Sequence, residues 1–126
     1  MPEVEAPVRL AIAPDPRHLR LARLTASSLA ADLDYAVRDI DDLKVAIDEL
    51  CAVLLVDAAG PLELAFAPGP EGLVVEGSAP TAATSEPRLH PIAAELLATI
   101  AAEFSVTQHG GVRRFRLVHL PDDRQR

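Results

Sequence analysis

Apolar residues recur at three- and four-residue steps in the middle of the chain, between Asp41 and Leu55. This period is typical of an amphipathic helix with one face on the core. Asp41 and Asp42 stand at its expected start, where carboxylates cap free N–H groups and complement the helix dipole. The pattern predicts a helix over 41–55 that faces a sheet, with the apolar stripe Leu43, Ala46, Ile47, Leu50, Cys51 and Leu54.

Shorter patterns on either side of this helix predict the remaining elements. Val8, Leu10 and Ile12 alternate with Arg9 and a small residue, as in a half-buried strand, and Asp15-Pro16 marks a helix start. Glycine and proline steps separate the later strands. The expected order is a strand over 8–12, a helix over 16–31, a connector over 34–39, the 41–55 helix, strands over 62–67 and 73–76, a loop over 77–89, a helix over 90–103, and strands over 104–109 and 113–120.

The last predicted helix has its own inward stripe of Ile92, Leu96, Leu97 and Ile100. Hairpins and helices that segregate in this way indicate an α+β fold. We expect a two-layer sandwich of helices on one face of a mainly antiparallel sheet. No repeat or linker divides the chain, so one domain over 8–121 is expected, with a flexible N-terminal tail at 1–7 and a C-terminal tail at 122–126.

Composition narrows the class of protein. Hydrophobic residues make up 49% of the 126 residues, which excludes a disordered chain, and aromatic residues only 3%. A net charge of −7 disfavours direct nucleic-acid binding, because such proteins need a basic face. No signal peptide or membrane-length apolar run is present, and the single cysteine cannot form an internal disulfide. A soluble, cytoplasmic protein is expected, with no membrane partner.

The segment DDLKVAIDELCAVLL resembles the N-box helix of the anti-sigma-factor serine kinases, a branch of the GHKL (Bergerat-fold, histidine-kinase-like) ATPase superfamily. In that family the helix presents a Glu as general base and, four residues later, an Asn that binds the Mg²⁺ of ATP. Glu49 stands at the position of the base, and Val53 replaces the Asn. Valine offers no oxygen to a hard cation, so no metal ligand remains at this position.

The family also carries a D-x-G-x-G box for adenine after the second hairpin strand, and a glycine-rich lid. The counterpart here is Glu76-Gly77-Ser78-Ala79-Pro80. The resemblance implies that Glu76 and Gly77 are the residues that would contact adenine, whereas Ser78 and Pro80 replace both glycines. Pro80 cannot adopt the φ values of glycine. Residues 79–97 contain no glycine. The resemblance therefore implies a degenerate site, with Glu49 a vestigial base, no cofactor expected and at most weak binding of ATP and Mg²⁺.

The resemblance also implies partners. Family members are usually homodimers that bind a sigma factor and phosphorylate an anti-anti-sigma protein. The run Leu21 to Thr25 resembles their first helix, where an Arg helps to hold the sigma factor, so Arg23 and its neighbour Arg20 are candidate partner-binding residues. The alternative for both is a set of solvated charges on a surface helix.

Other chemistry-bearing residues have plainer interpretations. Cys51 lies on the apolar stripe and is expected to be a small core residue. Glu49 has the alternative of a solvated helix face. Arg113, Arg114 and Arg116 form a basic cluster that either docks an acidic partner or protects an edge strand, which we favour. The histidines lack zinc-ligand spacing and are expected at the surface or in turns: His18, His90, His109 and His119.

Three functions compete at this stage. The favoured one is an anti-sigma-like regulatory protein that binds a sigma factor or an anti-anti-sigma partner, with kinase activity lost or weak. An active, atypical ATP-dependent serine kinase would use Glu49 as base and another group for the metal. A relative in fold alone would serve oligomerisation or an unrelated partner.

Overall fold

Five antiparallel strands form one sheet in the computed structural model, which describes residues 7–70 and 72–122. The sheet order is β1-β2-β3-β5-β4, and every pair of neighbours is antiparallel. The two tails predicted at 1–7 and 122–126 fall almost wholly outside the described residues. The strands are β1 Val8–Ile12, β2 Leu62–Pro68, β3 Leu73–Pro80, β4 Glu103–His109 and β5 Val112–His119.

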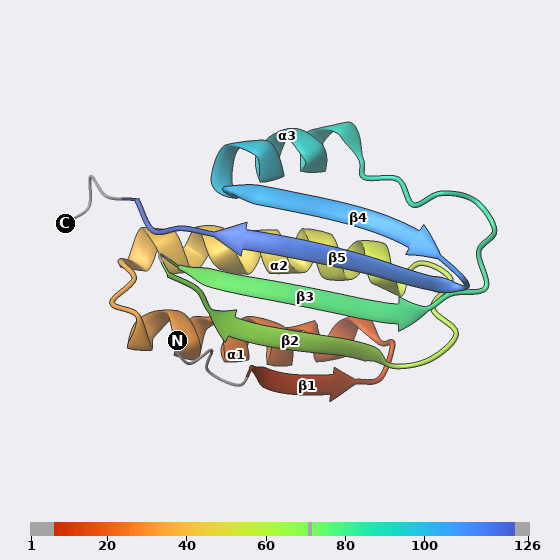
Figure 1. Cartoon of the computed structure of the whole chain (residues 1–126), viewed down its shortest axis with the longest axis horizontal. Coiled ribbons are helices and arrows are strands. Elements are labelled where there is room, and N and C mark those ends of the chain that lie inside the picture. The colour runs from red at the N-terminus through yellow and green to blue at the C-terminus, as the bar shows by residue number, and fades with distance from the viewer. Residues whose placement is uncertain (1–6, 71, 123–126) are drawn as a thin grey trace.

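The helices lie together on one face of the sheet (Figure 1). They are the short 3₁₀ helix η1 Pro16–His18 and the α-helices α1 Leu19–Asp32, α2 Val37–Leu55 and α3 Pro91–Ile100. The other face carries no helix among the described residues. The α+β fold of helices on an antiparallel sheet, predicted from the sequence, is confirmed.

The core lies between the two layers and consists mainly of aliphatic side chains. Alternate residues of β2 and β3 point into it, so Leu62, Leu64 and Phe66 are buried while their neighbours are more exposed. The inward stripe of α2 matches the predicted one, and Leu50 and Cys51 are fully buried. Lacking tryptophan, the chain fills the space with leucine, isoleucine, valine and alanine.

α2 begins four residues earlier than the sequence pattern indicates. Its N-cap is Ala36, which makes no side-chain cap, so the expected capping by Asp41 and Asp42 is wrong. Asp39 lies in the first turn and is buried, and its Oδ1 accepts the N–H of Asp122 at 3.0 Å. A long-range contact therefore extends the helix into the predicted connector.

α1 also begins differently, although its predicted cap is confirmed. Asp15 accepts the N–H of Arg17 at 2.9 Å, and their side chains form an ion pair at 2.7 Å. These bonds lower the pKa of Asp15 to about 2. The first turn after the cap is 3₁₀, and the α-helix starts only at Leu19.

α3 is shorter than predicted, and its expected inner face is wrong in part. Ala93 and Leu97 are buried, whereas Ile92 is 70% exposed and Leu96 is 37% exposed. Ile92 and Leu97 are five residues apart, which is about 140° around a helix, so they cannot share one narrow face. His90 caps this helix, because its Nδ1 accepts the N–H of Ile92 at 3.1 Å.

A buried polar cluster fastens the α1–α2 connector to the sheet. The Tyr35 hydroxyl donates to the carbonyl of His119 at 2.7 Å and accepts the N–H of Leu73 at 3.1 Å. His119 is buried, so the expectation that all histidines lie at the surface or in turns is wrong. Burial lowers the pKa of His119, although the charges of Asp39 and Asp42 oppose this shift.

We expect Leu50→Ala to lower the free energy of unfolding by about 2–5 kcal/mol, because it removes buried methyl groups and leaves a cavity. Glu49→Ala is the matched control on the same helix turn, and should change it by less than about 1 kcal/mol. Urea unfolding of both variants measures the difference. Equal losses would show that the two side chains are not on different faces.

The stability of the protein should fall as the pH drops below about 6.5, the pKa of His119 in the unfolded chain. In the folded state that pKa is lower, so the unfolded chain binds a proton that the folded one resists. His119→Gln should remove this part of the dependence. Urea unfolding at about pH 7.5 and about pH 5 tests it. Parallel stability losses in both proteins would assign the acid sensitivity to other groups.

Candidate functional site

The two N-box positions lie on one side of the C-terminal half of α2. Glu49 is half-buried, and it has no hydrogen-bond or ion-pair partner in the described part of the chain. Val53 follows four residues later and is 8% exposed. Between them, burial raises the pKa of the Cys51 thiol to about 12, so the thiol stays protonated at neutral pH.

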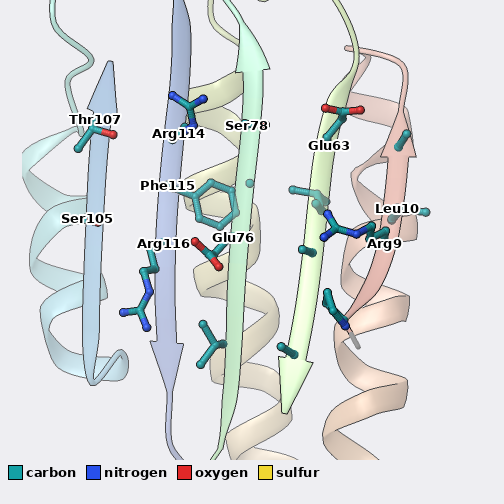
Figure 2. Close-up of a pocket in the computed structure, with 17 residues that line it drawn as sticks. Arg9, Leu10, Glu63, Glu76, Ser78, Ser105, Thr107, Arg114, Phe115 and Arg116 are labelled. Atoms are coloured by element: carbon teal, nitrogen blue, oxygen red, sulfur yellow. The ribbon is translucent and has the colours of Figure 1, made fainter. Parts of the chain in front are cut away.

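Glu76 lies on the opposite side of the sheet from these residues. It is an exposed residue of β3, and its register partners are Ala65 and Arg116. Figure 2 shows its carboxylate on the uncovered face of the sheet. Because the sheet stands between Glu76 and α2, the fold does not bring the expected base and the expected adenine carboxylate together.

Gly77 points the other way, into the core, for a reason unrelated to a nucleotide. A Cβ at this position would collide with the Phe115 ring and with Leu64. The expected loop over 77–89 is also wrong at its start, because β3 continues to Pro80 and pairs with β5 over its whole length. The box residues are therefore extended strand and not a glycine-dependent turn.

The C-terminal end of α2 is capped by a buried arginine from β5. Arg113 is 3% exposed, and its Nη1 donates to the carbonyls of Val53 at 3.0 Å and Val56 at 3.2 Å. The last carbonyls of a helix carry partial negative charge, which a guanidinium stabilises. The Arg113 Nε donates to Gln108 Oε1 at 2.8 Å. The guanidinium is thus held beside Val53, the position at which the resembled family carries its Mg²⁺-binding Asn.

The segment after β3 is tied to the same place. Gln108 donates to the carbonyl of Ala83 at 3.0 Å, which links the arginine to this segment. The carbonyl of Asp57 accepts the N–H of Ala82 at 3.0 Å and the Thr81 hydroxyl at 3.3 Å. A lid in this position would have to break these bonds to move, so the arrangement does not fit Mg·ATP.

The basic cluster of β5 does not behave as a unit. β5 lies between β3 and β4, so the favoured interpretation of a protected edge strand is wrong. Arg113 points into the core, whereas Arg114 and Arg116 are exposed on the uncovered face. Successive residues of a strand point to opposite faces, so Arg113 is separated from Arg114 and Arg116. The role of Arg113 as a cap of α2 is what the sequence interpretation missed.

Both candidate partner-binding residues lie on α1. Arg20 is exposed, and Arg23 forms an ion pair with Asp48 of α2, with Nη1 to Oδ1 at 2.7 Å. The side chains of this pair are 36% and 41% exposed, so the guanidinium is held at the surface where α1 meets α2. Leu24, next to it, is 61% exposed.

The uncovered face of the sheet forms a shallow hollow of about 850 Å³ (Figure 2). Small side chains on alternate strand positions form much of its floor, among them Ala65 and Ser78. The charged residues around them are Arg9, Glu63, Glu76, Arg114 and Arg116.

Comparison with known proteins adds no relative: no protein-family model matches the chain, and no curated protein matches it significantly. Over residues 7–70 and 72–122, no three histidine, cysteine or acidic side chains gather in a way that could hold a metal ion. No helix in the same residues has the length and apolar character needed to cross a bilayer.

Calorimetry with Mg·ATP at millimolar concentration should show no saturable binding. The reasons are the missing metal ligand at Val53, the guanidinium of Arg113 beside it, and the separation of Glu49 from Glu76 by the sheet. Val53→Asn, which restores one family residue, should not create binding while Arg113 remains. A micromolar, Mg²⁺-dependent dissociation constant for the wild type would contradict this description of the site.

Proposed function

We propose that this protein is an anti-sigma-factor-like regulatory protein that captures a sigma factor, or an anti-anti-sigma partner, without nucleotide chemistry. The observation that carries the proposal is the Arg113 cap beside Val53, because a fixed cation at this place disfavours the kinase half of the resembled function and leaves the binding half unaffected. The predicted order of strand, two helices, hairpin, helix and hairpin is also the order found in the fold. A cytoplasmic location belongs to the same proposal.

The binding surface in this proposal is α1 together with the adjoining turn of α2. Arg23 offers a planar guanidinium that can make bidentate contacts to a carboxylate of the partner. Asp48 holds it in place before binding, which reduces the conformational entropy lost on association. Leu24, exposed beside it, supplies apolar contact area. The charge and the apolar side chain together form a small, pre-organised patch.

The alternative is an active, atypical serine kinase with Glu49 as general base. One observation favours it: the Glu49 carboxylate has no partner among the described residues and so is free to accept a proton. Phosphoryl transfer, however, depends on a metal ion that neutralises the phosphate charge. No oxygen ligand for this ion stands at Val53, so we favour the binding protein.

Arg23→Ala should weaken binding to the cognate sigma factor at least about tenfold, because charge-assisted contacts contribute about 1.5–3 kcal/mol each. Glu49→Ala should leave the affinity unchanged, and so should addition of Mg·ATP. Binding to the sigma factors of the same genome is measured by calorimetry, with circular dichroism as the check on folding.

Asp48→Asn is the control for the internal ion pair. It keeps the Arg23 guanidinium but removes the carboxylate that holds it, so Asp48→Asn should weaken binding less than Arg23→Ala does. A larger loss in Arg23→Ala than in Asp48→Asn assigns the difference to contact between Arg23 and the partner. Equal affinities of wild type and Arg23→Ala would exclude α1 from the interface. Failure of the wild type to bind any sigma factor or any anti-anti-sigma protein of the same genome would overturn the proposed function.

A further inference from the structure

The hollow on the uncovered face of the sheet contains charged residues in a regular order. Strand register places Glu63 of β2, Ser78 of β3 and Arg114 of β5 in one row, with Thr107 of β4 at its end. All four residues line the hollow. Figure 2 shows Glu63 and Arg114 at the same level of the sheet, on either side of Ser78. The row therefore presents an acid and a base with one small residue between them.

Neither charge of this row is neutralised within residues 7–70 and 72–122. Glu63 and Arg114 form no ion pair in these ranges, and the hydroxyls of Ser78 and Thr107 form no hydrogen bond there. Glu63, Arg114 and Thr107 are exposed, so they are accessible to a ligand from solvent. The row thus offers one hydrogen-bond acceptor with negative charge, one donor with positive charge, and two hydroxyls.

The neighbouring row has its charges in a different setting. It runs from Arg9 of β1 through Glu76 of β3 to Arg116 of β5. In Figure 2 the Arg9 side chain extends across β2 and so covers part of this row. Arg116 lies beside Glu76 in register and is 3.7 Å from Glu103. Acidic residues therefore adjoin Arg116, whereas none is the register partner of Arg114.

We propose that the row of Glu63, Ser78 and Arg114 binds a small zwitterion of the amino-acid class. The ammonium group of the ligand donates to the Glu63 carboxylate. The carboxylate of the ligand accepts from the Arg114 guanidinium, which can form two parallel hydrogen bonds to it, and from the Ser78 hydroxyl. A molecule with a single charge leaves Glu63 or Arg114 without a partner, so the row favours a ligand with both charges.

The other charges of the hollow also disfavour a ligand with one charge. Glu76 lies two residues from Ser78 on β3 and repels a lone anion above that serine. Arg9 is the register partner of Ala65, two residues from Glu63, and repels a lone cation beside that carboxylate. Each repulsion is offset for a zwitterion by attraction to its second charge, because both signs are present within a few ångströms.

The width of the row limits the length of the ligand. Residues two strands apart have their Cα atoms about 10 Å from each other. Side chains stand roughly perpendicular to a sheet, and a hydrogen bond of about 2.8 Å at each end leaves roughly 4 Å between the nitrogen and the carboxylate oxygen of the ligand. About one or two carbon atoms between the two charged groups give this separation. The size therefore corresponds to an α- or β-amino acid.

NMR titration of the ¹⁵N-labelled protein tests the class of ligand. The probes are glycine, β-alanine and the longer δ-aminovalerate, with propionate and propylamine as controls that carry one charge. At low salt and about 1–50 mM probe, glycine or β-alanine should shift the amide signals of Ser78 and Arg114 in a saturable way. The controls and δ-aminovalerate should bind at least about threefold more weakly, because exposed charge pairs contribute little individually. Equal binding of propionate or propylamine, or no saturation with either short zwitterion, would overturn the proposal.

Charge removal tests the residues. Glu63→Gln and Arg114→Gln keep a polar side chain and should each weaken binding of the better short zwitterion at least about threefold. Arg116→Gln is the matched control on the same strand and face, and should change it by less than about twofold. Unchanged binding by Glu63→Gln or Arg114→Gln, or an equal loss in Arg116→Gln, would contradict the assigned row.

Charge reversal separates the row from a general effect of the mutations. Glu63→Arg alone leaves two bases in the row and should abolish the preference for a zwitterion. The double variant Glu63→Arg with Arg114→Glu exchanges the two ends, so the ligand binds in the opposite orientation and its affinity should recover. A double variant that binds no better than Glu63→Arg would overturn the proposal. Circular dichroism of each variant excludes unfolding as the cause of a loss.

This site is independent of the proposed function. Sigma-factor capture uses α1 on the helix layer, whereas the row lies on the opposite face of the sheet (Figure 1). Failure of the zwitterion titration therefore leaves the proposed function standing, and failure of sigma-factor capture leaves this site standing.

Discussion

The hydrogen bonds from Arg113 to the end of α2 are the interaction on which the rest of the structure depends. A buried guanidinium costs several kcal/mol in lost hydration unless its N–H groups and its charge are compensated. Here the carbonyl oxygens of Val53 and Val56 and the Gln108 Oε1 accept its hydrogen bonds, and the helix dipole supplies the opposing charge. Through Gln108 the same group fixes the segment after β3. One residue thus joins β5, α2 and that segment.

This cap bears on which surfaces of the protein are open to a partner. The interior between α2 and the sheet holds a fixed cation and a packed aliphatic core, which leaves the two outer surfaces for recognition. The helix layer presents Arg23 and Asp48, and the open face of the sheet presents Glu76 and Arg116. The proposed sigma-factor contact lies on the helix layer, opposite to the open face of the sheet.

The order and type of the elements could be predicted from the sequence because they follow from local periodicity. The stripe of α2 is an example, since burial alone produces it. Element ends depended on distant contacts: Asp39 lies inside α2 because it meets the Asp122 N–H, and Ser78 to Pro80 form strand because β5 pairs with them. No local pattern carries that information.

The role of Arg113 could have been found in part. Strand alternation places it with Phe115 and Leu117 on the buried face, which separates it from Arg114. Its acceptors could not have been predicted, because the α2 carbonyls lie more than fifty residues away in the chain. The face of Glu76 could also have been predicted, because Glu76 ends the expected strand over 73–76 and alternates with the buried Val75. The resemblance placed it on the adenine side of the site without using this alternation.

A cap that is part of the chain also has a consequence for control. A ligand that stabilises a fold contributes in proportion to the logarithm of its concentration over its dissociation constant. Arg113 is part of the chain, so this cap on the end of α2 needs no ligand to form. Under the proposed function, release of the partner then depends on competition at α1 and not on ATP. This competition involves the partly exposed charges of Arg23 and Asp48, so screening by salt weakens it.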